Sequence, residues 1–169
     1  MQKIGVLSDT HSTLSSQVID FLSDTDIILH AGDIGNLETF EKLEKLKPFY
    51  AVYGNIDGID IRQRVKEFLN IKIEDVNILM THIGGFPRQY APKSLNLIRS
   101  IKPNIFISGH SHILKIMPDK KNNLLHINPG AAGNSGFHIF ITAVKFNIDG
   151  SQIKDVFIFE QKRTYSTNQ

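Results

Sequence analysis

Five short apolar runs dominate the first two-thirds of this chain, and each has the length of one buried β-strand. They are rich in Ile, Val, Leu and aromatic residues, the composition typical of strands that are covered on both faces. Polar stretches, several with the apolar spacing of a helix, separate them. The strands are expected at residues 4–7, 26–29, 49–53, 76–80 and 104–108.

Three of the intervening segments have helical character. Ser15 or Ser16 precedes the first and Asn36 the second, and such side chains accept hydrogen bonds from the free N–H groups of a first helical turn. Pro92 suits the first turn of the third, where no N–H group is needed. The helices are expected around residues 18–22, 37–46 and 93–101.

After residue 112 the pattern changes to strands joined by short polar turns. The Asp149-Gly150 pair is a strong hairpin signal. Helices and strands that alternate early, followed by meandering strands, indicate an α/β fold of two sheets packed face to face with helices outside. One domain over residues 1–162 is expected, followed by a polar tail, 163–169, that should fray. The late strands are expected at residues 113–117, 124–127, 137–146 and 153–159.

The composition excludes several kinds of chemistry. The chain has no cysteine, so disulfides, thiolate metal ligands and cysteine nucleophiles are ruled out. The net charge is +2 and no run of Lys or Arg exceeds two residues, so neither bulk nucleic-acid binding nor membrane association is expected. No signal-peptide segment or membrane-spanning run is present in the sequence, and a cytoplasmic location is expected.

Each of the five early strands leads into residues that can bind a metal ion. In open α/β sheets, ligands bind beyond the carboxyl ends of the strands, so donors that are distant in sequence should converge there. Two of them, His110 and His112, follow a glycine and flank a single residue, which is a fairly specific chelating pattern. The seven candidate donors are Asp9, His11, Asp33, Asn55, His82, His110 and His112.

Taken singly, most of these residues have ordinary structural explanations. Asp33 and Asn55 adjoin glycines and suit turns, and a histidine at a strand end, such as His82, is often a hydrogen-bonded core residue. Seven donors at five strand ends are too many for coincidence and for one tetrahedral ion. They favour two ions that share a carboxylate. Mixed carboxylate, amide and imidazole donors suit Mn, Fe, Zn, Ni or Co better than copper or calcium.

Other polar residues fit structural roles better than catalytic ones. His30 is expected to be a packed core histidine or a partner of a carboxylate, and His126 a structural residue. His138 could face the site. Arg88 is expected to be a solvated loop residue, with phosphate binding as the alternative. The glycine-rich segment 128–133 is expected to form a tight turn beside the site, and its amides could instead point at an anion.

The donor pattern resembles that of the calcineurin-like metallophosphoesterases. The matching motifs, in order, are Asp9-x-His11, Gly32-Asp33, Gly54-Asn55-x-Asp57, His82 and Gly109-His110-x-His112. The chain is most similar to the small bacterial and archaeal phosphodiesterase branch, which is related to the metallophosphoesterase-like subunit of the retromer complex.

This resemblance implies a four-layer αββα sandwich of two mixed sheets, with a dinuclear metal site at the strand ends. It implies that a hydroxide bridging two divalent ions, most commonly Mn²⁺, attacks the phosphorus of a small phosphoester in line. Asp33, Asn55 and His82 would be the catalytic residues. By matched position, Asp9, His11 and His112 would hold one ion, Asn55, His82 and His110 the other, and Asp33 would bridge them.

One position departs from the larger relatives, which place a histidine after the asparagine where this chain has Ile56. Help for the leaving group is therefore in question. A non-catalytic scaffold that binds protein partners is the main alternative function, and a mononuclear two-histidine, one-carboxylate oxygenase is a distant third. Exposed edge strands in the C-terminal half are compatible with a homo-oligomer.

Overall fold

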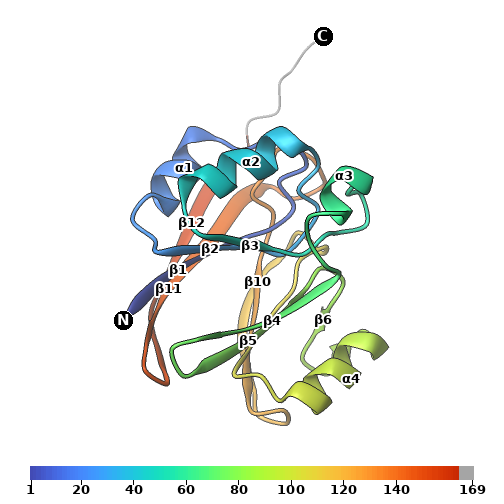
Figure 1. Ribbon diagram of the computed structural model, residues 1–169, viewed down its shortest axis with the longest axis vertical. Coiled ribbons are helices and arrows are strands. Elements are labelled where there is room, and N and C mark those ends of the chain that lie inside the picture. The colour runs from blue at the N-terminus through green and yellow to red at the C-terminus, as the bar shows by residue number, and fades with distance from the viewer. Residues whose placement is uncertain (164–169) are drawn as a thin grey trace.

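The computed structural model describes residues 1–163, and they form two five-stranded sheets (Figure 1). The first sheet combines strands from both ends of the chain, in the order β12-β11-β1-β2-β3. It is mixed, because β1, β2 and β3 run parallel while β11 and β12 are antiparallel to their neighbours. Its strands are β1 (Gln2–Leu7), β2 (Ile27–His30), β3 (Phe49–Ala51), β11 (Phe140–Asp149) and β12 (Gln152–Lys162).

The second sheet is built from the middle of the chain, in the order β4-β5-β8-β10-β9. It is also mixed: β5, β8 and β10 are parallel, and β4 and β9 pair antiparallel at the edges. A separate hairpin, β6 (Gly85–Phe86) and β7 (Gln89–Tyr90), belongs to neither sheet. The sheet strands are β4 (Phe68–Ile73), β5 (Val76–Thr81), β8 (Ile105–Ile107), β9 (Leu114–Asp119) and β10 (Leu124–Pro129).

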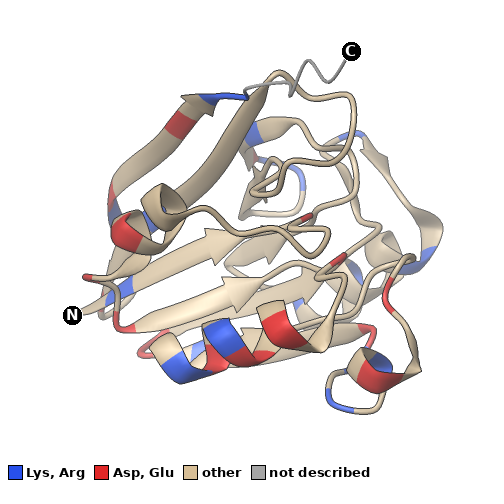
Figure 2. Ribbon diagram, turned by 90° about the horizontal axis from the view of Figure 1, so that it is seen from above, with Lys and Arg blue, Asp and Glu red and all other residues tan. Residues whose placement is uncertain are grey.

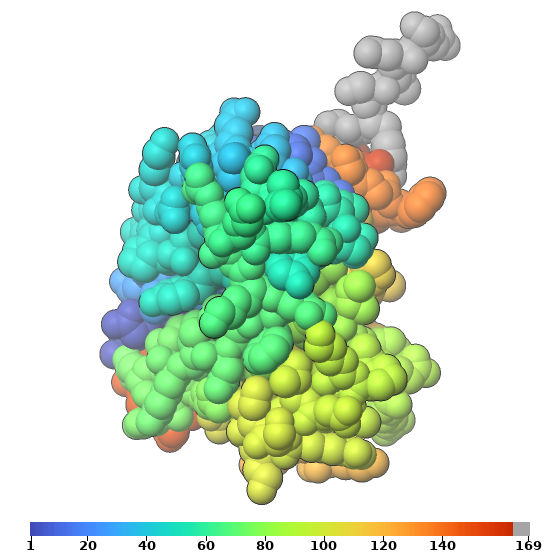
Figure 3. Space-filling view, turned by 45° about the vertical axis from the view of Figure 1, so that its right-hand side comes forward, coloured from blue at the N-terminus to red at the C-terminus, as the bar shows by residue number. Residues whose placement is uncertain are grey.

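Helices cover the outer faces of both sheets and complete a four-layer αββα arrangement. α1 (Ser16–Leu22) and α2 (Leu37–Leu46) lie on the first sheet and α4 (Pro92–Ile101) on the second, while α3 (Ile59–Arg62) is a single turn (Figure 1). In the space-filling view the early blue and cyan segments form the upper part and the green and yellow segments the lower part (Figure 3). The predicted fold class is confirmed.

The alternation of side chains along the strands explains why four layers form. In β1, Ile4 and Val6 point into the core between the sheets, whereas Leu7 packs with the residues of α1. In β5, Ile78 joins the same central core while Leu79 faces α4. Both faces of each central strand are therefore apolar, which is why these strands read as continuous apolar runs.

The helices begin where the sequence predicts. The Ser15 side chain accepts a hydrogen bond from Val18 N at 3.3 Å, and the Asn36 side chain accepts one from Thr39 N at 2.9 Å. Pro92 occupies the first turn of α4. Caps of this kind satisfy N–H groups that have no partner within the helix.

Charged residues lie mainly on helices, turns and edge strands, with both signs interspersed, and the central strands carry almost none (Figure 2). Among the described residues, no helix is both long and apolar enough to cross a membrane.

The structure differs from the predicted strands mainly in one boundary and one missed strand. The strand expected at 137–146 begins only at Phe140, because Gly136 has φ +125° and the His138 side chain turns toward His112. The strand β4 was missed. It is an edge strand in which buried Ile73 alternates with exposed Lys72, so it shows period-two alternation rather than a continuous apolar run.

Two short elements were also missed, α3 and the β6–β7 hairpin. Neither is long enough to show an apolar period. The tail predicted for 163–169 lies outside the described residues except for Arg163, whose backbone N–H donates to Ile139 O at 2.9 Å.

The packing of α4 generates a stability prediction. Ile98 is 1% exposed and lies among Leu79 and Phe106 of the second sheet. Ile98→Ala should lower the free energy of unfolding by about 2–4 kcal/mol, because it removes buried methyl groups and leaves a cavity. Asn96→Ala, on the exposed side of the same helix, should change it by less than about 0.5 kcal/mol. Urea unfolding of both variants measures the difference, and equal effects would contradict this account of the helix.

Candidate metal centre

The seven predicted donors lie together where the parallel strands of the two sheets end. The loops after β1 and β2 are tied by hydrogen bonds from Asp9 N to Gly32 O and from His11 N to Asp33 O, at 2.9 and 3.0 Å. The loops after β5 and β8 are joined by Gly109 N donating to His82 O at 3.0 Å. The site is therefore formed jointly by loops of the first sheet and loops of the second sheet.

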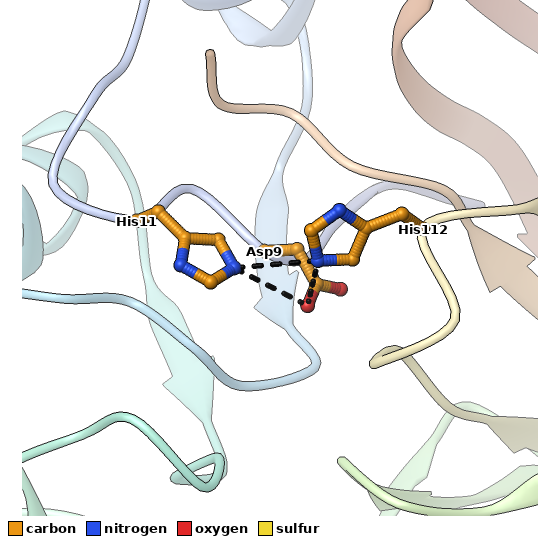
Figure 4. A group of neighbouring side chains, drawn as sticks. All are labelled: Asp9, His11 and His112. Atoms are coloured by element: carbon orange, nitrogen blue, oxygen red, sulfur yellow. Dashed lines mark hydrogen bonds and ion pairs between the residues drawn. The ribbon is translucent and has the colours of Figure 1, made fainter. Parts of the chain in front are cut away.

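Three of the donors form a compact triangle (Figure 4). His112 Nε2 lies 3.2 Å from Asp9 Oδ1 and 3.3 Å from His11 Nε2, and His11 Nε2 lies 3.8 Å from Asp9 Oδ1. Zn–N and Zn–O bonds of about 2.0–2.2 Å in a tetrahedral site place ligand atoms roughly 3.3–3.6 Å apart. The triangle thus has the dimensions of three ligands around one ion.

A second group lies beside the first and contains Asp33, His82 and His110. His82 Nε2 lies 3.3 Å from Asp33 Oδ2 and 3.1 Å from the Asn55 side-chain oxygen. The same Asp33 oxygen is 3.7 Å from His11 Nε2 of the first group. Its other oxygen, Oδ1, accepts a hydrogen bond from Ile56 N at 3.0 Å. Asp33 therefore offers one oxygen to both groups.

The electrostatics of the site suit a cation. Asp9 is fully buried, and its Oδ1 has no hydrogen-bond partner even though it faces two imidazoles. A buried carboxylate oxygen left unpaired is costly. Burial raises the pKa of Asp9, but the attraction of the nearby His11 and His112 imidazoles outweighs this effect, so the net pKa is lowered. The carboxylate is held ionised and needs a positive partner.

The carboxylates of Asp9 and Asp33 also change the pKa values of the neighbouring imidazoles. The pKa of His11 is raised, first by its interaction with Asp9. Burial alone would lower the pKa of His82, but Asp33 and Asp9 raise it overall. Ionised carboxylates packed beside imidazoles provide negative charge and nitrogen donors together, which suits a bound metal cation.

Strained backbone brings the donors together. Asp9, His11, Asp33, His110 and His112 all have positive φ values, between 45° and 68°. This conformation is uncommon for residues other than glycine and clusters at functional sites. The chain therefore turns sharply at Asp9 and His11 and is not extended there.

Glycine is required at two neighbouring positions by close approach. A Cβ atom on Gly32, whose φ is +94°, would lie 2.7 Å from His82 Nδ1, and one on Gly54 would lie 2.0 Å from Asp33 Oδ1. Any side chain at either position would displace a donor. These glycines belong to the motifs because the donors pack against their backbone.

Hydrogen bonds behind the donors fix which imidazole nitrogen faces the site. His82 Nδ1 lies 2.8 Å from Ala31 O, and since a carbonyl only accepts, Nδ1 carries the hydrogen and Nε2 presents a lone pair. His138 Nε2 likewise donates to Gly133 O at 2.9 Å, which leaves His138 Nδ1 as an acceptor for His112 Nδ1 at 3.1 Å. In both His82 and His112, the hydrogen is therefore held on Nδ1 and the lone pair of Nε2 is free to bind a metal ion.

Some of these supports had no sequence signal. The Ala31 carbonyl was missed because every residue type carries one. Asp57 ends the Gly54-Asn55-x-Asp57 motif, and its two oxygens accept hydrogen bonds from Gly35 N and Gly54 N, both at 2.8 Å. It braces the loops that carry Asp33 and Asn55.

The structure also places His30 and Arg88, for which the sequence left two roles open. His30 is a buried core histidine, in contact with Thr10 Oγ1 at 3.0 Å and with Gly32 N at 3.1 Å. Arg88 is exposed and lines a separate cavity with Arg99 and Lys120.

The segment 128–133 is not the tight turn expected, because Asn128 and Pro129 end β10 and residues 130–133 form the loop that follows it. The alternative that the amides of this segment point at an anion was wrong at two positions. Ala132 N donates to Ser8 O and Gly133 N to Asp9 O, at 2.9 and 3.1 Å. These amides hold the loop after β1 instead.

The donors open into a cavity of about 500 Å³ with a partly apolar rim. Ile56, Ile113 and Phe137 are exposed around it, and Phe137 is wholly exposed. His110 and Asn55 are the most accessible of the seven donors. A phosphoryl group can therefore reach the donor atoms while apolar substituents contact the rim.

Comparison with known proteins finds similar sequences and similar solved structures. The chain is 34% identical over 134 residues to a probable metallophosphoesterase of Methanocaldococcus jannaschii, covering 76% of this chain and 67% of that protein. Among solved structures, Vps29 of Entamoeba histolytica complexed with Zn²⁺ superposes with a TM-score of 0.74 at 20% identity, covering 95% of this chain and 98% of that one.

A structure described as a novel archaeal phosphodiesterase gives a TM-score of 0.70 at 23% identity, covering 93% of this chain and 99% of that one. At these identities the two structures show a shared fold. The model of the calcineurin-like phosphoesterase superfamily domain matches residues 2–151, and membership supports a metal-dependent phosphoesterase. This chain belongs to the calcineurin-like phosphoesterase superfamily.

Proposed function

We propose that this protein is a cytoplasmic, metal-dependent phosphodiesterase whose domain spans residues 1–162. The observation that carries the proposal is the position of Asp33 Oδ2, 3.3 Å from His82 Nε2 and 3.7 Å from His11 Nε2. One carboxylate oxygen shared by two donor groups is the arrangement that a pair of ions requires. Two-ion sites typically hold their metals about 3.5–4 Å apart.

The residues present fit two divalent ions. We assign one ion to Asp9, His11 and His112 and the other to Asn55, His82 and His110, with Asp33 between them. The buried, unpartnered Asp9 Oδ1 supports the first ion, because without a cation it has no partner. We propose Mn²⁺ for both positions, with Fe, Zn, Ni and Co as alternatives, since oxygen and imidazole donors suit all of them.

Two bound ions would supply a hydroxide nucleophile near neutral pH and neutralise charge on the phosphoryl oxygens. The protein's own residues orient the reaction. Asp33 fixes the separation of the two groups, and Asn55 and His82, whose side-chain atoms lie 3.1 Å apart, hold the more open side where substrate enters. No protein nucleophile is required.

Metal content and hydrolysis of bis(p-nitrophenyl) phosphate, measured on the same preparation, test the proposal. We expect about two ions per chain and hydrolysis that is lost on chelation and restored by Mn²⁺. Retained secondary structure after chelation would show that the ions serve the site rather than the fold. Metal-loaded protein that leaves both phosphodiesters and phosphomonoesters intact would refute the activity.

A non-catalytic scaffold is the second candidate, favoured by the close superposition on Vps29 structures. The exposed Ile56, Ile113 and Phe137 would then contact a protein partner. A further copy of the chain could add to the edge strand β12, where Val156 and Phe157 are exposed. If the protein is a scaffold, Asp33→Asn should leave partner binding unchanged. If it is an enzyme, the same substitution should lower turnover.

The shared carboxylate yields the first functional prediction. Asp33→Asn should weaken binding of both ions and lower hydrolysis by more than the roughly 10–100-fold that loss of an outer hydrogen-bond partner costs. His112→Ala should deplete chiefly one ion. Metal analysis and steady-state kinetics distinguish the two variants. Full activity with two bound ions in Asp33→Asn would remove Asp33 from the bridging position.

The position of Ile56 yields the second. Ile56 lines the cavity, and its side chain can neither donate a proton nor hydrogen-bond an alkoxide. General-acid assistance is worth about 10²–10⁴-fold, so the wild-type protein should strongly favour aryl over alkyl phosphodiesters. Ile56→His should improve the poor leaving groups selectively. A shallow dependence of rate on leaving-group pKa in the wild type would contradict this prediction.

The support of His112 yields the third. In His138→Ala, His112 Nδ1 loses its acceptor, so the ligating tautomer is no longer fixed. Affinity for one of the two ions should fall about 10–100-fold, as measured by competition with a chromogenic chelator. Phe137→Ala, next in sequence and fully exposed, is the control and should leave affinity unchanged. Equal affinities in both variants would show that His138 does not support the metal.

A further inference from the structure

A second cavity, of about 310 Å³, adjoins the metal cavity beneath the β6–β7 hairpin. The two cavities share His110, Ser111 and Ile113 as lining residues. A molecule whose phosphate lay at the donors could therefore extend a substituent into this second cavity. The volume falls within the range of small-molecule sites, roughly 300–1,000 Å³.

The walls of this cavity are suited to a flat ring. Phe86 and Tyr90 of the hairpin contribute aromatic side chains. Lys115 lies with its ammonium group 3.5 Å from the centre of the Phe86 ring, and it has no carboxylate partner among the described residues. Aromatic side chains can stack on a planar group, and the Lys115 ammonium can donate hydrogen bonds to carbonyl oxygens or ring nitrogens of that group.

His126 also lines this cavity, and its hydrogen bonds are missing. The residue is fully buried, and neither ring nitrogen has a hydrogen-bond partner. Burial, followed by the charge of Lys115, lowers the pKa of His126 to about 4, so the ring is neutral near pH 7. A neutral imidazole offers one N–H donor and one acceptor nitrogen.

Two unpaired nitrogens on a buried ring need an explanation, since buried polar groups are nearly always paired. The neighbouring polar groups do not supply a partner. The Tyr90 hydroxyl donates to Asp119 at 3.0 Å, and the Asn128 amide donates to Gly109 O and Ser111 Oγ at 2.9 and 3.0 Å. The imidazole is therefore free to pair with a ligand.

We propose that this cavity binds the base of a nucleotide phosphodiester whose phosphate lies at the metal centre. The inference rests on the proposed function and names its substrate class. A nucleobase is planar, and its edge carries N–H donors and C=O or ring-nitrogen acceptors, so it can pair with the His126 nitrogen that faces it, whether that nitrogen donates or accepts. An alkyl or lipid substituent would leave both nitrogens unpaired, and such a site discriminates strongly against groups that cannot hydrogen-bond.

The hairpin provides the route of entry. Both His126 nitrogens are shielded from water, so a base reaches them only when the hairpin shifts. β6 and β7 pair with each other and with neither main sheet. Ser108 Oγ donating to Gly85 O at 3.2 Å and Ala91 N donating to Gly84 O at 3.0 Å hold the base of the hairpin, and the Tyr90 hydroxyl donating to Asp119 at 3.0 Å anchors β7. Entry of a base therefore requires Tyr90 to move away from Asp119.

Direct binding to the Mn²⁺-loaded protein tests the proposal, with ribose 5-phosphate as the ligand that lacks a base. Isothermal titration of AMP, GMP, CMP and UMP should show at least one nucleotide binding about 10-fold or more tightly than ribose 5-phosphate. In His126→Phe, which keeps a ring but removes both nitrogens, this preference should disappear. His126→Gln, which restores a donor and an acceptor, should recover part of it.

Two further variants make the result independent of folding. Lys121→Gln alters an exposed cation outside this cavity and should leave the preference unchanged. If His126→Phe fails to fold, Lys115→Gln replaces it, and the preference should fall several-fold. In the wild type, ring-nitrogen NMR shifts of His126 should change on adding the preferred nucleotide and stay fixed with ribose 5-phosphate.

The outcomes separate this inference from the proposed activity. Hydrolysis of bis(p-nitrophenyl) phosphate without any preference for nucleotides over ribose 5-phosphate would overturn the base pocket and leave the phosphodiesterase standing. A nucleotide preference that survives in His126→Phe would also overturn it. Base-dependent binding by a protein that hydrolyses no phosphoester would support the pocket and refute the activity.

Discussion

The Asp33 carboxylate is the contact on which the rest of the site depends. One oxygen is fixed by Ile56 N, and this leaves the other equidistant, within half an ångström, from the imidazoles of His11 and His82. Its position requires a left-handed backbone at Asp33 itself and a glycine at position 54, where a Cβ would overlap the carboxylate. This oxygen is shared by the two donor groups, one on each side of it.

The architecture explains why that meeting point exists. Each sheet has three adjacent parallel strands, β1–β3 in the first and β5, β8 and β10 in the second. Carboxyl ends of parallel strands lie along one edge, and packing the sheets face to face brings two such edges together. The central core is apolar and continuous, so the strained loops are supported by packing that does not depend on them.

The sequence predicted the identity of the donors better than their geometry. Strand ends carrying Asp, Asn and His are readable because apolar runs stop abruptly beside them. The left-handed turns at Asp9 and His112 are not readable, since local preference disfavours them and only tertiary contacts impose them. The edge strand β4 was not predicted for another reason. Its outward Asn70 and Lys72 face solvent, so it never forms an apolar run.

The contacts of the supporting residues were predicted least well, and the reason is physical. The sequence marked Asp57 as part of a motif and His138 as a residue that could face the site, but only the structure shows that Asp57 accepts hydrogen bonds from backbone amides and that His138 pairs with another imidazole. The same holds for His126. Its alternation with apolar neighbours correctly indicated burial, but only the structure shows that burial leaves both nitrogens unpaired.

The metal donors and the residues that line the second cavity lie on different parts of the fold. The reactive donors sit on loops that are cross-linked to both sheets by backbone hydrogen bonds, as preorganised chemistry requires. The residues that would recognise a substituent lie under a hairpin that belongs to neither sheet. Changes in the hairpin can alter the size and polarity of the second cavity without moving Asp33. In the proposed function, phosphoester chemistry and substrate choice are therefore separable, because the strand ends of the two sheets would carry the first and a hairpin outside both sheets would carry the second.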